Sequence, residues 1–117
     1  MPEPEGDGAH GTASAGLISA QGNNGIGVSG VAWHCKLMPI RIAGATGFIT
    51  EADIATAIRW SAKNGADIQN HSWGAEYPML PVHSAIKDVT VPDGIGRRGK
   101  ECIVVSVSYT HLTLPTN

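Results

Sequence analysis

Segments with the residue spacing of helices alternate along this chain with short segments that have the character of strands. Apolar or small residues recur at helical intervals in three segments, at 9–20, 51–64 and 82–89. Strand-like patterns occupy three others, at 36–43, 66–71 and 102–107. Neighbouring parallel strands need a long crossover, which a helix usually provides. The alternation therefore predicts an α/β fold built on a parallel sheet.

The segment at 51–64 carries the clearest helix signals. Thr50 precedes it and Asp53 follows three positions later, a variant of the capping box in which each side chain bonds the other residue's backbone. Gly65 follows the segment as a stop signal. The buried stripe of this helix is expected to consist of Ile54, Ala57, Ile58, Ser61 and Ala62.

The strand expected at 36–43 contains an internal conflict. Met38, Ile40 and Ile42 alternate as in a half-buried strand, but Pro39 has no N–H group to donate to a β-ladder. We therefore expect this strand at an edge or in an irregular position of the sheet.

Composition narrows the classes of partner. The chain has 117 residues, a net charge of −2 and no cluster of Lys and Arg, which argues against nucleic acid and anionic membranes as partners. No apolar stretch is long enough for a membrane span, and the acidic first residues lack the apolar core of a signal peptide. At this length, one small domain is the upper limit.

A series of short motifs carries the chemical information. His10-Gly11-Thr12 opens the first helix, a Gly/Asn loop follows at 21–30, and three further motifs come later. These are Leu37-Met38-Pro39-Ile40-Arg41, Asn64-Gly65-Ala66-Asp67-Ile68 and Asn70-His71-Ser72-Trp73-Gly74. In this order and spacing the motifs resemble the subtilase family of serine endopeptidases, over about residues 4–105.

The resemblance implies a parallel-sheet, three-layer α/β fold of the subtilisin type, truncated at both ends in this chain. It implies peptide-bond hydrolysis by an Asp-His-Ser triad, with a peptide or protein as substrate and no cofactor for the chemistry. His10 matches the catalytic histidine, a general base that takes the serine proton and returns it to the leaving amine. Ser72, Trp73 and Gly74 match the segment whose main chain pairs with an extended substrate; the alternative is an ordinary turn at a strand end.

The Gly/Asn loop also resembles the structural calcium loop of the family. Calcium takes roughly six to eight oxygen ligands, often including backbone carbonyls. The resemblance implies that, in the intact parent, Asn24 contributes its side-chain oxygen and Ile26 and Val28 their carbonyl oxygens. A metal-free turn is the alternative, and both stay open at this point.

The motifs that carry the other catalytic residues of the family are missing from the sequence. It contains no Asp-Ser/Thr-Gly segment for the aspartate, no Gly-Thr-Ser segment for the nucleophile, and no Ala-Gly-Asn segment for the oxyanion asparagine. We therefore expect this fragment to be inactive by itself. The alternative hypothesis is a non-catalytic α/β binding or interaction module that kept the scaffold.

A second pattern in the Gly/Asn loop points to a different ligand. Residues 25–30 fit the dinucleotide-binding pattern G-x-G-x-x-G. That pattern must follow a strand and open a helix, whereas this loop follows a helix and leads toward a strand. Nucleotide binding is therefore disfavoured.

Two domain-level expectations follow. Residues 1–105 are expected to form the partial catalytic domain. Residues 106–117 are expected to be a non-native or disordered tail, because they lack core periodicity and resemble translated sequencing-adapter DNA.

The cysteines and the remaining histidines show no metal-binding spacing. The sheet order implied by the resemblance places two strands between those of Cys35 and Cys102, so two free thiols are expected. Exposed or hydrogen-bonded side chains are expected for the remaining histidines, which are His34, His71, His83 and His111.

Overall fold

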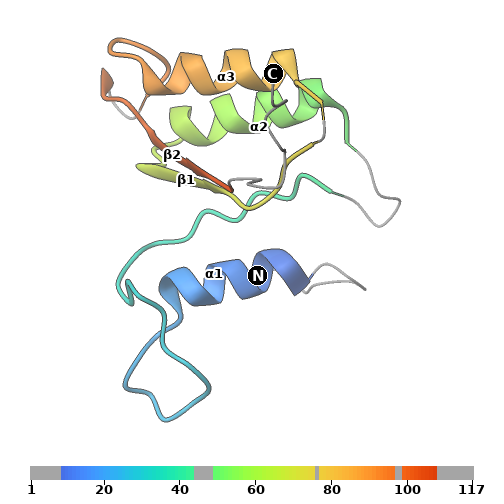
Figure 1. Cartoon of the computed structure of the whole chain (residues 1–117). Coiled ribbons are helices and arrows are strands. Elements are labelled where there is room, and N and C mark those ends of the chain that lie inside the picture. The colour runs from blue at the N-terminus through green and yellow to red at the C-terminus, as the bar shows by residue number, and fades with distance from the viewer. Residues whose placement is uncertain (1–8, 44–48, 76, 97–98, 108–117) are drawn as a thin grey trace, which may run out of the picture. The chain divides into compact units, whose positions relative to one another are not determined.

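The computed structural model describes residues 9–43, 49–75, 77–96 and 99–107. Two helices, α1 (Ala9–Ser19) and α2 (Glu51–Lys63), come first in the chain, and β1 (Ile68–His71), α3 (Leu80–Thr90) and β2 (Ile103–Ser106) follow (Figure 1). The chain divides into two compact units, with α1 in residues 1–48 and the other four elements in residues 49–117.

In the first unit, the predicted helix at 9–20 is confirmed to within one residue, as α1. The chain then folds back on the end of this helix. Gly30 N–H donates to the Ala20 carbonyl at 2.8 Å, and Ala32 N–H donates to the Ile18 carbonyl at 2.8 Å. Gly30 has to be a glycine, because a Cβ at this position would lie 2.5 Å from the backbone nitrogen of Ala20. None of the residues of α1 is buried.

The strand predicted at 36–43 is wrong, because the structure has no regular secondary structure there. A β-strand exists only through hydrogen bonds to a neighbouring strand, and the described residues contain a single strand pair, β1 with β2. Pro39 further removes one of the N–H donors that a ladder would use. The alternation of Met38, Ile40 and Ile42 therefore indicated a strand that this structure does not form.

In the second unit, β1 and β2 pair in parallel, and the pairing runs from Ile68 opposite Ile103 to His71 opposite Ser106. Helix α3 lies between the two strands in the sequence, and α2 and α3 lie side by side over one face of the strand pair (Figure 1). This arrangement confirms the predicted α/β class with parallel strands.

The ends of α2 are set by the signals seen in the sequence. Thr50 Oγ1 accepts a hydrogen bond from Asp53 N–H at 3.2 Å, and an Asp53 carboxylate oxygen accepts one from Thr50 N–H at 3.1 Å. At the other end, Gly65 takes a positive φ of 94°. The N–H groups of Gly65 and Ala66 then bond the carbonyls of Ala62 and Ser61, which satisfies carbonyls that the helix end would otherwise leave without partners.

The core of the second unit lies between α2, α3 and the start of β2. Its fully buried apolar residues are Ala55, Ile58, Ala62, Val82, Ala85, Val89 and Cys102. Of the predicted stripe of α2, Ile58, Ser61 and Ala62 are buried and Ile54 packs half-buried against the core. Ala57 is only half-buried, and Ala55, which was not predicted, is buried. An ion pair between Arg59 and Asp88, 2.7 Å apart, joins the outer faces of the two helices. Both side chains remain about one-third exposed, so the pair contributes about 1 kcal/mol at most.

The carboxyl end of β2 reaches the expected tail. Ser106 belongs to β2, and Val107 N–H donates to the His71 carbonyl at 3.1 Å. Residues 108–117, and His111 with them, lie outside the described residues. The proposed domain boundary at residue 105 therefore stays a prediction.

Both cysteines are free thiols in this structure, with Cys35 exposed in the first unit and Cys102 buried in the second. The expectation of two free thiols in the intact parent stays a prediction. No helix in the described part of the chain has the length and apolar character needed to cross a membrane.

Candidate active site

His10 is the second residue of α1, and its side chain is exposed. The following residue, Gly11, has open space: among the described residues, no atom outside the local helix backbone lies within 4 Å of a Cβ built there. The same is true of Gly16, about one and a half turns further along. The His10 side chain is thus exposed at the start of α1, as a general base must be in order to meet a nucleophile and a substrate.

The Gly/Asn loop after α1 takes the left-handed conformations that its composition predicts. Positive φ angles occur at Asn23 (58°), Gly25 (72°) and Gly27 (60°). Asn and Gly accept this region at little cost, unlike other residues. Within the loop, Asn24 Oδ1 accepts a hydrogen bond from Ile26 N–H at 3.0 Å, which closes a local turn.

The same loop fits part of a calcium site. A carbonyl oxygen can accept twice, so Asn24 Oδ1 keeps one lone pair after its bond to Ile26. In the described part of the chain, no hydrogen bond uses the carbonyl oxygens of Ile26 and Val28. These three oxygens are too few for calcium, and no group of three or more His, Cys, Asp or Glu residues among those described could hold a metal ion. Further ligands would have to come from other residues.

The segment Ser72–Gly74 follows β1 directly. Ser72 Oγ accepts a hydrogen bond from the Asn70 side-chain amide at 2.7 Å. Ser72 and Trp73 are half-buried, whereas Gly74 is exposed. A glycine in this position leaves the main chain accessible, as pairing with an extended peptide requires.

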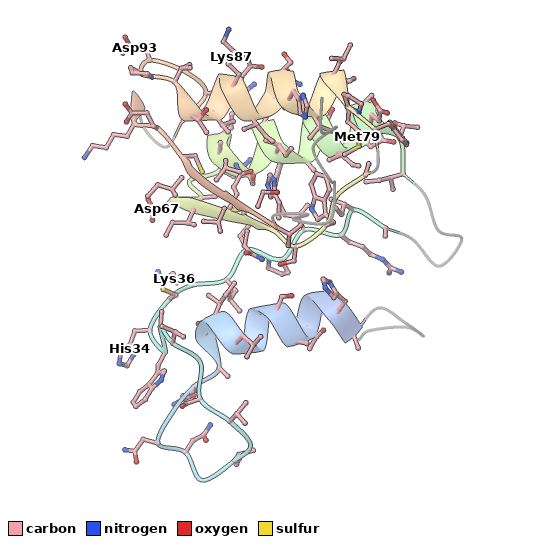
Figure 2. The ribbon with its side chains drawn as sticks, in the orientation of Figure 1. His34, Lys36, Asp67, Met79, Lys87 and Asp93 are labelled. Atoms are coloured by element: carbon pink, nitrogen blue, oxygen red, sulfur yellow. The ribbon has the colours of Figure 1, made fainter. Side chains whose placement is uncertain are left out.

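A pocket of about 190 Å³ lies beside this segment. Its walls come from the carboxyl ends of β1 and β2, from the chain after β1 and from α3, and they include His71, Trp73, Tyr77, Val82 and Ser106. Met79, labelled in Figure 2 at the start of α3, also lines it. Ligands of open parallel sheets bind at the carboxyl ends of the strands, so this is the expected place for a substrate.

Two buried polar side chains lie on the helix-facing side of β1. Gln69 and His71 are each only 7% exposed. His71 Nε2 lies 3.1 Å from Gln69 Oε1, and the imidazole stacks on the indole of Trp73. Burial lowers the pKa of His71 below the usual histidine value, because the charged form loses hydration. An exposed or hydrogen-bonded side chain was expected for His71. The imidazole is hydrogen-bonded to Gln69, as expected, but its stacking on Trp73 was not predicted.

The predicted site residues fall into both units. His10 and the loop residues Asn24, Ile26 and Val28 belong to the first unit, and Ser72–Gly74 belong to the second. Within the second unit, the structure brings Trp73 and Gly74 together at one pocket with His71. The alternation of residues 69 and 71 in β1, continued at residue 73 just after the strand, was the signal that could have placed these side chains on one face.

Comparisons with known proteins identify the subtilase family. The model of the subtilase family matches residues 2–108. The calcium-dependent protease of Trichormus variabilis is 39% identical over 120 aligned positions, which cover 90% of this chain and 17% of that protein. Subtilisin Savinase of Lederbergia lenta is 35% identical over 89 positions, covering 76% of this chain and 33% of the relative. The chain thus spans a third or less of the length of these curated relatives.

Proposed function

This chain belongs to the subtilase family, and on that premise we propose that it is the catalytic-histidine portion of a subtilisin-like serine endopeptidase with an Asp-His-Ser triad. The observation that carries the proposal is the position of His10, in a His-Gly-Thr motif at the exposed start of α1. The match to the family spans both this motif and the Ser72–Gly74 segment.

In the proposed reaction, His10 is the general base. Its imidazole takes the proton of a serine hydroxyl as the oxygen attacks the peptide carbonyl, and later gives that proton to the leaving amine. The triad aspartate and serine would come from Asp-Ser/Thr-Gly and Gly-Thr-Ser segments, which the 117 residues do not contain. The 117-residue chain alone is therefore inactive in this account.

The substrate is a peptide or protein held beside β1. Ser72, Trp73 and Gly74 would pair through their main chain with an extended substrate, as an added strand. The neighbouring pocket supports this assignment, because it would receive one substrate side chain next to the paired backbone.

Calcium would have a structural role. Asn24 Oδ1 and the carbonyls of Ile26 and Val28 would supply three of its oxygens, and bound calcium would stabilise the loop that follows α1. One relative is named as a calcium-dependent protease, which supports the assignment.

A serine-directed fluorophosphonate probe tests the proposal in the full-length protein that contains this chain. The expected result is one labelled serine, in a Gly-Thr-Ser segment, with peptide hydrolysis lost in proportion to labelling. A full-length protein that shows neither a labelled serine nor peptide hydrolysis would favour the non-catalytic binding module instead.

A further inference from the structure

Three side chains on one face of the chain at β1 are linked in series. Gln69, His71 and Trp73 occupy alternate positions, so they point to the same side of the strand and its continuation. Gln69 Nε2 donates to the Ile58 carbonyl of α2 at 3.0 Å. The linked groups therefore lead from the middle of α2 to Trp73 in the proposed substrate segment.

Chemistry fixes the direction of each hydrogen bond in this series. The Ile58 carbonyl can only accept, so the amide nitrogen of Gln69 must face it and the amide oxygen must face His71. The Nε2 atom of His71 must then carry the proton that it donates to Gln69 Oε1. This arrangement allows one orientation of the Gln69 amide and selects one tautomer of the neutral imidazole.

The imidazole held in this way supports Trp73. The ring centroids of His71 and Trp73 lie 5.1 Å apart with an angle of 23° between the planes, which is a stacked pair. Both rings line the pocket of about 190 Å³ at the carboxyl ends of the strands. Trp73 also packs against the core, so its indole is held from two sides.

We propose that His71 is a positioning residue for the substrate. Anchored to α2 through Gln69, it holds the Trp73 indole in place as one wall of the pocket, and it thereby determines which substrate side chain the pocket accepts. His71 acts through Trp73 and takes no part in proton transfer to the substrate. This inference rests on the proposed function, because it assigns the pocket to a peptide.

The test measures kcat/KM in the full-length protein that contains this chain, with peptides varied in turn at each position around the scissile bond. His71→Ala is expected to lower selectivity about tenfold at one peptide position and to leave the other positions within about twofold. His71→Phe keeps a ring for stacking but loses the bond to Gln69. Its loss of selectivity should therefore be about half that of His71→Ala on a logarithmic scale. Gln69→Leu should resemble His71→Phe.

His34→Ala is the matched control, because it removes an exposed histidine from the other unit and should leave selectivity unchanged. Melting temperatures identify the variants that remain folded. A folded His71→Ala protein with unchanged selectivity, or with an equal loss at every peptide position, would overturn the proposal.

A second measurement needs no variant at position 71. Nuclear Overhauser contacts between the ring protons of His71 and Trp73 are expected in the unaltered protein, both free and with a bound peptide inhibitor. Their absence in the bound state would overturn the positioning role. If the full-length protein hydrolyses no peptide at all, the proposed function fails, while these contacts still report whether the two rings are coupled.

Discussion

The imidazole of His71 stacks on the indole of Trp73, with ring centroids 5.1 Å apart and an interplanar angle of 23°. The stack joins a buried side chain of β1 to the segment that we assign to substrate binding. Because burial lowers the pKa of His71, the ring is neutral at neutral pH and donates from Nε2 to Gln69. The same burial makes the stability of this unit depend on pH.

The first prediction concerns that pH dependence. Below about pH 6.5, the unfolded chain binds a proton at His71 that the folded protein binds only at lower pH. The free energy of unfolding therefore falls with decreasing pH, by up to about 1.4 kcal/mol per pH unit, until the folded-state pKa is reached. Above about pH 6.5 this contribution is fully present.

Thermal melts of the full-length protein and of His71→Phe, from pH 8 to pH 4, would check this prediction. His71→Phe lacks the titrating group. As the pH falls, the melting temperature of the unaltered protein should therefore decrease more than that of His71→Phe. Parallel curves for the unaltered protein and His71→Phe would contradict the account.

The second prediction concerns the start of α2. Thr50→Ala removes the side chain that caps Asp53 N–H, so the free energy of unfolding should fall by about 1 kcal/mol. Thr56→Ala is the matched control, because Thr56 lies inside the same helix, where alanine is the better helix former. Urea unfolding of the full-length variants, followed by spectroscopic signals from the second unit, measures both changes in the free energy of unfolding. Equal losses would show that the cap contributes nothing specific.

Local signals in the sequence were sufficient for α2 and for the class of the fold. The Thr50–Asp53 pair and Gly65 define the two helix ends through bonds that reach only a few residues. The segment at 36–43 failed because a strand depends on a partner, which no local pattern supplies.

The buried residues of the candidate site likewise depend on contacts that a local sequence pattern does not predict. The alternation of Gln69, His71 and Trp73 was visible in the sequence, but their bonds depend on the carbonyl of Ile58, eleven residues before Gln69. Family resemblance predicted His10 as the catalytic histidine and Ser72–Gly74 as the substrate-binding segment. Both roles are proposals.

The third prediction concerns calcium. The full-length protein should melt at a higher temperature in calcium than in chelator, because calcium binds only the folded loop. Asn24→Ala should reduce this difference, and Asn24→Asp, which keeps the oxygen, should preserve it. Gln21→Ala, at the edge of the loop, is the control. Equal melting temperatures in calcium and in chelator would mean that Asn24 binds no calcium and only closes the local turn with Ile26.

The fourth prediction concerns the 117-residue chain by itself. We expect no peptidase activity and no cooperative thermal transition. The strand pair exposes Ile68 (60%), Ile103 (56%) and Val105 (50%), so its open face favours association with other chains. Circular dichroism melts and size-exclusion chromatography would check this. A sharp transition in a monomer would refute the expected instability, and labelling by a serine-directed probe would refute the expected inactivity.

Single-turnover and steady-state kinetics of His10→Ala in the full-length protein show whether His10 is the general base of a serine endopeptidase. The matched control is His34→Ala, another exposed histidine of the same unit. We expect His10→Ala to lower kcat by roughly four orders of magnitude with an unchanged melting temperature, while His34→Ala keeps full activity. A folded His10→Ala protein that hydrolyses peptides at a near-normal rate would contradict this role.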